Sequence, residues 1–205
     1  MKLLELFAGS KSIGKVAEEL GFQVFSSDIK SFEGINYIVD ILELNVSKVP
    51  FIPDIIWASP PCTGFSVSSI GYHWTGGRGA YIPKTKTARL GIEMVKRTLE
   101  IIKYFNPQFY FIENPRGILR KMPFMQNLKR YTVTYCQYGD DRMKPTDIWT
   151  NSDKWQPRPM CKNGDTCHKS APRGSRTGTQ GKENAYERSK IPYELCLEIL
   201  KSCIY

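Results

Sequence analysis

The chain has 205 residues, 41% hydrophobic and 24% charged, a length and composition that fit one globular domain with room for a small subdomain. No apolar run approaches the ~20 residues that cross a bilayer, and Glu5 interrupts the apolar N-terminus, so we expect an intracellular protein and exclude a membrane-spanning or secreted one. The net charge of +9 is uneven, because residues 1–60 carry five Lys and Arg against eight Asp and Glu and residues 61–205 carry 24 against 12, which predicts a polyanionic partner for the later part of the chain.

Residues 1–60 alternate short apolar segments with turns. Apolar residues recur on one face over residues 13–20 and predict a helix, which Gly21 ends. Four strands are predicted in this part of the chain, over residues 3–8, 22–28, 35–39 and 53–59.

The later part of the chain contains the longest predicted helix. Apolar residues recur at helical spacing over residues 87–105, and Asn106-Pro107 ends this helix. Residues 71–86 predict a loop, and residues 151–185 predict a long loop or a small irregular subdomain. The remaining predicted elements are strands over residues 109–112 and 131–138, a hairpin partner over residues 147–150, and a helix over residues 191–204.

Strands that alternate with helices predict an α/β fold with a mostly parallel sheet and flanking helices. In such sheets, ligands bind beyond the carboxyl ends of the strands. The residues suited to chemistry follow these predicted strand ends, namely Gly9, Asp28, Asp40, Pro60-Pro61-Cys62 and Glu113-Asn114.

The first three strand ends suggest a nucleoside cofactor. A glycine turn at Gly9 lets the backbone approach a ligand closely. Asp28 is placed to accept hydrogen bonds from ribose hydroxyls, and Asp40 to accept one from an adenine amino group. Each residue alone is also typical of an ordinary turn or helix cap, whereas the three in order favour the cofactor.

Cys62 is the predicted nucleophile. Two prolines stop a buried strand immediately before it, and a rigid turn of this kind can hold a thiol in a fixed direction. Attack requires the thiolate, which nearby positive charge favours. A buried structural cysteine is the alternative interpretation.

Glu113 is the predicted partner of Cys62. It follows an apolar strand, where burial favours the protonated carboxyl group. A carboxyl group that hydrogen-bonds a ring nitrogen makes that ring a better electrophile. The alternative is a glutamate that caps a helix or forms a salt bridge.

These segments resemble the DNA cytosine-5 methyltransferase family. Phe7-Ala8-Gly9 is similar to its first motif, Pro60-Pro61-Cys62 matches its nucleophile motif, and Glu113-Asn114-Pro115 resembles its Glu-Asn-Val motif. The likeness is strongest to the short enzymes of phages and prophages. The resemblance implies a Rossmann-like fold with a small irregular insertion, S-adenosylmethionine as cofactor, and a cytoplasmic location in a bacterium or a phage-infected host cell.

The resemblance also implies a reaction. Cys62 attacks carbon 6 of a cytosine that is flipped out of double-stranded DNA, and carbon 5 then takes the methyl group. Glu113 contacts ring nitrogen 3 and the exocyclic amine. It further implies a catalytic core over residues 1–150, a reduced target-recognition region over residues 151–185, and a helix over residues 186–205 that completes the core.

The implied site residues form three groups. The catalytic group is Cys62, Glu113 and Lys144. The cofactor-binding group is Phe7, Ala8, Gly9, Ser10, Asp28, Ile29, Asp40, Ile41, Ser59 and Pro60. The nucleic-acid-binding group is Ser66, Arg78, Arg116, Arg142, Arg173 and Arg176.

Two departures from the family pattern keep alternatives open. Lys11 stands where the cofactor turn commonly has glycine, and Lys144 and Thr146 fall where an arginine pair is usual. The same chemistry on RNA is one alternative. A nucleic-acid-binding homologue without activity is the other, although the intact Cys62 and Glu113 argue against it.

Cys161, Cys167 and His168 raise the question of zinc. Structural zinc ligands prefer Cys-x(2–4)-Cys spacing, whereas five residues separate these cysteines. A fourth ligand would have to come from elsewhere in the chain, and Cys136 is one option. The spacing therefore favours an ordinary loop, and we expect no metal.

Overall fold

The computed structural model describes residues 1–169 and 184–204. Its centre is a seven-stranded sheet in the order β3-β2-β1-β4-β7-β9-β8. Neighbours among β3, β2, β1, β4 and β7 are parallel, and β9 is antiparallel to both β7 and β8. The strands are β1 (Lys2–Leu6), β2 (Gln23–Asp28), β3 (Tyr37–Ile38), β4 (Ile55–Ala58), β7 (Phe109–Pro115), β8 (Arg130–Thr134) and β9 (Pro145–Thr150).

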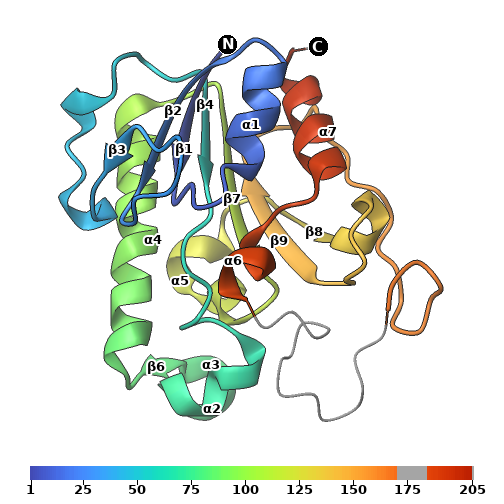
Figure 1. The fold of residues 1–205 in the computed structure, drawn as a ribbon. Helices are drawn as coiled ribbons and strands as arrows, with labels where there is room; N and C mark the ends of the chain where they lie inside the picture. Colours follow the sequence, from blue (N-terminus) through green and yellow to red (C-terminus); the bar gives the residue numbers. More distant parts are fainter. Residues whose placement is uncertain (170–183, 205) are drawn as a thin grey trace.

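Helices cover both faces of the sheet (Figure 1). Helix α4 (Lys86–Phe105) lies on one face, and α1 (Ser12–Glu19) and α7 (Tyr193–Ile204) lie side by side on the other. Shorter helical segments are α2 (Ile70–His73), α3 (Gly77–Ala80), α5 (Pro123–Gln126), α6 (Ala185–Ser189), η1 (Ile41–Glu43), η2 (Val46–Lys48), η3 (Val67–Ser69), η4 (Ile118–Lys121) and η5 (Tyr135–Tyr138).

Successive side chains of each strand point to opposite faces of the sheet, so the core forms two apolar layers, one on each face. Leu3 and Ile55 pack against α1 and α7, whereas their chain neighbours Leu4 and Ile56 pack toward α4. Because both faces are covered, the central strand β4 is apolar and buried along its whole length, as expected for a doubly wound sheet. Within the described residues, no helix is both long and apolar enough to cross a membrane.

The order of the strands places the site. The chain adds β2 and β3 on one side of β1 and then β4 and β7 on the other, so the direction of winding reverses between β1 and β4. Ligands bind at such a reversal, beyond the carboxyl ends of the strands. The predicted mostly parallel α/β fold is confirmed.

Several predicted elements are wrong in detail. Residues 71–86 are not a plain loop, because they contain α2, α3 and a second sheet of β5 (Trp74–Thr75) and β6 (Ile82–Pro83). Trp74 anchors this segment, since it is buried and its Nε1 donates to the carbonyl oxygen of Gly64 over 2.6 Å. The predicted strand over residues 35–39 is reduced to β3.

The predicted strand over residues 131–138 ends early, at Thr134. Tyr135, Cys136 and Tyr138 are all buried, and a short buried apolar run of this kind does not by itself distinguish a strand from a helical turn. These residues instead form the 3-10 turn η5, which Gly139 ends with a φ of 85°. The predicted helix over residues 191–204 is confirmed as α7, and the separate short helix α6 precedes it.

Candidate active site

Cys62 follows β4 in a rigid turn. The strand ends at Ala58, and Pro60 and Pro61 have no backbone N–H with which to continue the ladder. The carbonyl oxygen of Cys62 accepts a hydrogen bond from the backbone N–H of Phe65 over 2.9 Å. This turn leaves Cys62 half-buried at the carboxyl end of the sheet.

Glu113 lies at the end of the neighbouring strand. β7 pairs with β4 in parallel, so the two strand ends reach the same edge of the sheet. The side chain of Asn114 is fully buried, and its Nδ2 donates to the carbonyl oxygen of Pro60 over 2.8 Å. This hydrogen bond ties the turn before Cys62 to the strand end that carries Glu113.

Gly117 allows the two chain segments to approach closely. A Cβ atom at this position would lie 2.2 Å from the carbonyl oxygen of Phe65. Ser66 and Gly117 form a β-bridge, and the N–H of Ile118 donates to the same Phe65 oxygen over 2.9 Å. The segment after Cys62 therefore rests directly on the segment after Glu113.

Tyr135 holds the carboxyl group of Glu113. The hydroxyl group of Tyr135 donates to Oε1 of Glu113 over 2.9 Å, and both side chains are buried. Lys144 lies on the ring of Tyr135, with Nζ 4.5 Å from the ring centroid. Burial raises the pKa of Tyr135 well above its usual value, so the hydroxyl group keeps its proton for this bond.

The thiol of Cys62 is affected by charges of both signs. Burial raises its pKa above 9.0, and the negative charge of Glu113 raises it further. Lys144 and Arg188 act in the opposite direction and favour the thiolate. The two cations therefore offset part of the cost of a charged sulfur beside a carboxylate.

Lys144 is held in an unusual backbone conformation. Its φ is 27°, in the region that favours glycine, and its side chain is buried. Nζ donates to the carbonyl oxygen of Arg188, in α6, over 3.0 Å. Burial lowers the pKa of Lys144, and the nearby carboxylate of Glu113 counteracts this effect.

The first predicted cofactor turn is built on Asp28. The backbone N–H of Gly9 donates to its Oδ2 over 3.0 Å, and that of Lys30 to its Oδ1 over 2.9 Å. Phe7 and Gly9 both have positive φ, of 57° and 48°, so the chain turns sharply after β1. Ala8 and Ser10 are buried beside them.

The rest of the predicted cofactor group, around Asp40, combines polar and apolar side chains. Oδ1 of Asp40 accepts from the N–H of Leu42 over 3.0 Å and so caps η1. Ile41 is buried, whereas Ile29 is 60% exposed directly after Asp28. Two carboxylates that can accept further hydrogen bonds, beside an exposed aliphatic side chain, fit the hydroxyl and amino groups and the flat ring of a nucleoside.

Ser59 and Pro60 complete the predicted cofactor group at the end of β4. Ser59 is half-buried and its Oγ accepts from Trp57 Nε1 over 2.9 Å, whereas Pro60 is buried.

Lys11 replaces glycine at little cost to the turn. Its φ is 53°, so a residue with a side chain adopts the conformation that glycine favours. The side chain packs on Gly34, and Nζ forms an ion pair with Glu18 over 2.8 Å. These contacts stabilise a backbone shape that lysine alone would disfavour.

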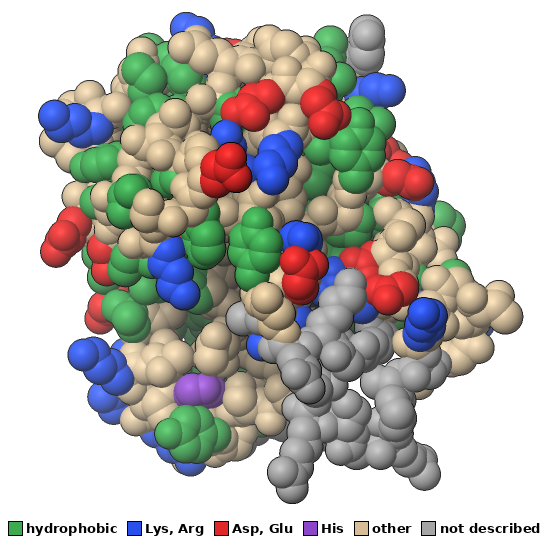
Figure 2. All heavy atoms as spheres, viewed as in Figure 1, with side chains coloured by type: hydrophobic (Ala, Val, Ile, Leu, Met, Phe, Trp, Pro, Cys, Tyr) green, Lys and Arg blue, Asp and Glu red, His purple; other side chains and the backbone are tan. Residues whose placement is uncertain are grey.

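Among the predicted nucleic-acid contacts, Arg116 is exposed and Ser66 is half-buried. Arg173, Arg176 and the side chain of Arg78 lie outside the described part of the structure. Lys and Arg side chains gather at the lower left of Figure 2, over the lower end of α4 and the segment that contains α2 and α3. Three exposed basic residues of this region are Lys84, Lys86 and Arg89.

Arg142 is not a surface contact, and this prediction is corrected. Its side chain is 1% exposed, and its Nε donates to Oδ1 of Asp140 over 2.8 Å. Its Nη1 donates to the carbonyl oxygen of Arg188 over 3.2 Å. A guanidinium group used in this way stabilises the loop before Lys144 and cannot reach a phosphate in this conformation.

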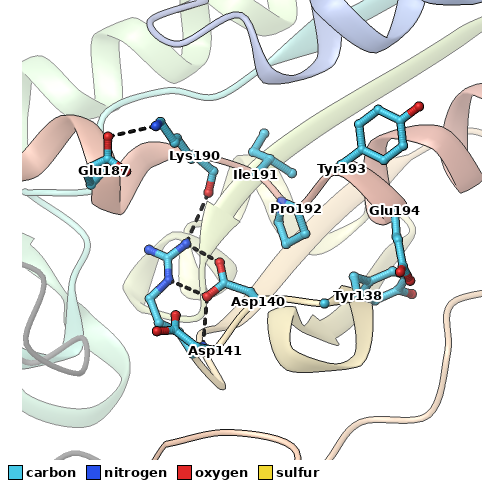
Figure 3. A pocket seen from close by; sticks show the side chains of 11 residues that line it. Tyr138, Asp140, Asp141, Glu187, Lys190, Ile191, Pro192, Tyr193 and Glu194 are labelled. Carbon is cyan, nitrogen blue, oxygen red and sulfur yellow. Dashed lines mark hydrogen bonds and ion pairs between the residues drawn. The ribbon is translucent and has the colours of Figure 1, made fainter.

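A surface pocket of about 560 Å³ lies beside this loop (Figure 3). Its walls are the Asp140–Arg142 pair on one side and the chain from Glu187 to Glu194 on the other. Neither Cys62 nor Glu113 lines it, so it is distinct from the strand ends that carry the candidate site.

The structure gives roles to three residues that are absent from the catalytic, cofactor-binding and nucleic-acid-binding groups implied by the sequence. Tyr135, Asn114 and Arg188 acquire their roles through partners 22, 54 and 44 positions away along the chain. A lone tyrosine in an apolar run carries no signal of such a role. Asn114 could have been found, because it lies inside the Glu113 motif.

A family model and a protein of known sequence both match this chain, and both are described as cytosine-5 DNA methylases or methyltransferases. The family model of the C-5 cytosine-specific DNA methylases matches residues 1–132. The "Probable DNA (cytosine-5)-methyltransferase" of Frog virus 3 (isolate Goorha) is 32% identical over 174 residues, which are 82% of this chain and 78% of that protein.

A solved structure shares the fold. It is an Escherichia coli prophage protein described as a candidate DNA modification methyltransferase, with a TM-score of 0.51 and 17% identity. The match covers 73% of this chain and 46% of the other, so this chain spans about half the length of that protein.

Proposed function

The chain belongs to the C-5 cytosine-specific DNA methylase family, and from this premise we propose that it transfers a methyl group from S-adenosylmethionine to carbon 5 of cytosine in DNA. The observation that carries the proposal is the hydrogen bond from Asn114 to the Pro60 carbonyl oxygen, 2.8 Å long. It holds the strand ends of Cys62 and Glu113 together, so one pyrimidine ring can meet a thiol and a carboxyl group at the same time.

The turn after β1 and the two acids beyond it would hold the cofactor. Asp28 would accept from the ribose hydroxyls and Asp40 from the adenine amine, with Ile29 and Ile41 against the adenine ring. Phe7, Ala8, Gly9 and Ser10 would lie along the cofactor, with Ser59 and Pro60 closing the site. S-adenosylmethionine, when bound, supplies an electrophilic methyl group.

Cys62 and Glu113 would act on the base. The Cys62 thiol gives its proton to water, a step that Lys144 and Arg188 favour, and the thiolate Sγ forms a bond to carbon 6 of cytosine. Glu113 holds ring nitrogen 3 and the exocyclic amine, so the electron pair of the ring moves to carbon 5. Carbon 5 would take the methyl group, leaving S-adenosylhomocysteine. Carbon 5 would then lose its proton to a water molecule, and the returning electron pair would release the Cys62 thiolate.

The target cytosine would have to leave the helix stack, because both faces of its ring are covered in duplex DNA. The exposed Arg116 adjoins the Glu113 strand end, and we place it on a phosphate together with Lys84, Lys86 and Arg89. Ser66 follows Cys62 by four residues and is assigned to the same surface. Arg78, Arg173 and Arg176, whose side chains lie outside the described part of the structure, stay proposed nucleic-acid contacts.

A trapping experiment tests this function. Fluorine at carbon 5 cannot leave as the proton does, so DNA with 5-fluorocytosine should become covalently bound to the wild-type protein when the cofactor is present. Cys62→Ser should form no adduct. Asn114→Asp, which removes the amide donor to Pro60, should form the adduct more slowly.

Parallel RNA substrates distinguish the alternative chemistry, because an adduct on RNA alone would overturn DNA as the substrate. No adduct on either nucleic acid, from a folded protein that binds DNA, would identify a binding protein without activity.

A further inference from the structure

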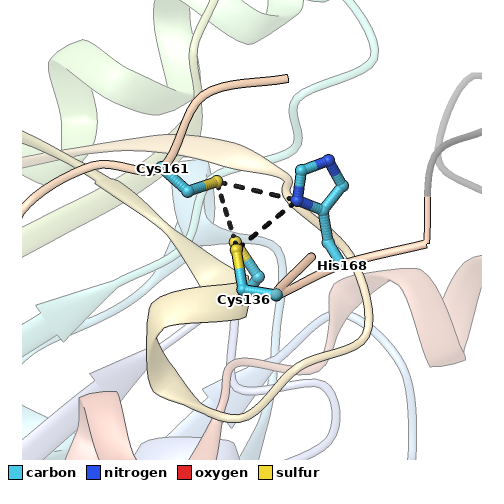
Figure 4. A group of neighbouring side chains, drawn as sticks. Cys136, Cys161 and His168 are labelled. Carbon is cyan, nitrogen blue, oxygen red and sulfur yellow. Dashed lines mark hydrogen bonds between the residues drawn. The ribbon is translucent and has the colours of Figure 1, made fainter. Parts of the chain in front are cut away.

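Four side chains that the proposed reaction does not use converge at one point. Cys136 comes from η5, and Cys161, Cys167 and His168 come from the segment after β9 (Figure 4). Their Sγ and nitrogen atoms all lie within 4.8 Å of one another. Figure 4 shows Nδ1 of His168 directed at the sulfur atoms and Nε2 directed away from them.

Three of the separations between these ligand atoms match the edges of a small tetrahedron. A zinc ion with bonds of about 2.3 Å to sulfur and about 2.0 Å to nitrogen separates its ligand atoms by about 3.5 to 3.8 Å. Cys161 and Cys167 lie 3.8 and 3.6 Å from Nδ1 of His168, and Cys167 lies 3.6 Å from Cys136. The Cys136–Cys161 separation is shorter, at 3.0 Å.

The surrounding hydrogen bonds hold these donors in place. The backbone N–H of Cys161 donates to Oγ1 of Thr134, at the end of β8, over 3.0 Å. The N–H of Lys169, directly after His168, donates to the carbonyl oxygen of Asp141 over 3.0 Å. Both ends of the Cys161–His168 segment are therefore attached to the chain on either side of η5.

We propose that Cys136, Cys161, Cys167 and His168 bind one Zn²⁺ ion as a structural site. Three thiolates and one imidazole fill a tetrahedral coordination shell, so no position is left for substrate or water. The spacing of Cys161 and Cys167 favours an ordinary loop and leaves Cys136 as only one option for a fourth ligand, whereas the fold brings Cys136, 25 residues before Cys161, to within 3.0 Å of it.

A bound zinc ion would stabilise the candidate active site through η5. Cys136 follows Tyr135 directly, so an ion bound to Cys136 fixes the turn from which Tyr135 holds Glu113. The metal proposal itself rests only on the four ligands and does not depend on the methyltransferase function.

Metal analysis of the full-length protein, purified in zinc-containing medium without chelators, tests the proposal. We expect one zinc per chain in the wild type and in Cys203→Ser, a control that removes a buried thiol of α7 outside the cluster. Cys161→Ser and His168→Ala should lose the stoichiometric zinc. A wild-type protein that is purified without zinc and takes up none when zinc is added would overturn the proposal.

Cobalt substitution gives a readout that does not depend on whether the variants fold. Wild-type protein with Co²⁺ in place of zinc should show the intense visible d–d bands and the thiolate charge-transfer band of a tetrahedral site. A chelator should abolish these bands and lower the Tm. Octahedral cobalt spectra, or a Cys136–Cys161 disulfide as the main form in reduced preparations, would contradict the zinc site.

Discussion

The hydroxyl group of Tyr135 donates a 2.9 Å hydrogen bond to Oε1 of Glu113 inside the protein. The bond joins η5 to the end of β7. A buried carboxyl group without such a partner could rotate away from the ring that it has to hold. Tyr135 is therefore a positioning residue for the proposed reaction.

Tyr135→Phe should lower kcat while KM for S-adenosylmethionine changes little, because the cofactor contacts lie at other strands. Loss of a hydrogen bond to a charged group is worth about 1.5–3 kcal/mol, which is about tenfold to a hundredfold in rate. Steady-state methylation kinetics measure both constants. Tyr138→Phe is the matched control, because its hydroxyl group accepts from Arg158 N–H and not from the site. Equal losses in both variants would point to a purely structural effect.

The reactivity of Cys62 should depend on Lys144. Burial and Glu113 raise the thiol pKa above 9.0, so alkylation by iodoacetamide should accelerate as the pH rises past neutrality. Lys144 lowers this pKa, and Lys144→Gln should therefore slow the alkylation of Cys62 at any fixed pH below it. Peptide mass spectrometry follows Cys62 separately from the exposed Cys167. The exposed Lys15→Gln serves as control, and an unchanged rate in Lys144→Gln would refute the electrostatic coupling.

Local sequence patterns predicted the ends of the strands. They did not predict the contacts between residues far apart along the chain. The helix over residues 87–105 was found almost to its ends, since 3.6-residue periodicity is a property of neighbouring residues. The turn at Cys62 follows from two prolines in the same way. In contrast, the bond between Tyr135 and Glu113 and the meeting of Cys136 with Cys161 depend on how β7, β8 and β9 pair, which no single segment encodes.

The role implied for Arg142 was wrong. The resemblance implied a nucleic-acid contact, yet the side chain is buried against Asp140 only two residues before it. Composition gives the sign of a charge, whereas burial depends on the whole fold.

Glu5 should make stability fall as the pH rises. Burial in β1 raises its pKa from 4.5 to about 8, so between these values the folded state holds a proton that the unfolded state has lost. The contribution is complete below pH 4.5 and decreases by about 1.4 kcal/mol per pH unit until the pH reaches about 8. Urea unfolding across this range measures the slope.

Glu5→Gln keeps an uncharged side chain of the same shape and should flatten that slope. The exposed Glu43→Gln provides the control, for which the slope should remain. If the wild type and Glu5→Gln lose stability in parallel as the pH rises, Glu5 is not the group that titrates.

Gly117→Ala should weaken the site by moving the segment next to Cys62. The new Cβ would lie 2.2 Å from the Phe65 carbonyl oxygen, so one of the two backbone segments has to shift. Overpacking of this kind costs about 1–3 kcal/mol, and the Ser66–Gly117 bridge would be lost with it.

Gly71→Ala is the control, because its Cβ would meet nothing within 4 Å. The rate of adduct formation with 5-fluorocytosine DNA should fall more than tenfold in Gly117→Ala, relative to Gly71→Ala, at a temperature where both are folded. A normal rate in a folded Gly117→Ala protein would mean that the position of Cys62 does not depend on this contact, and that the Asn114 hydrogen bond alone fixes it.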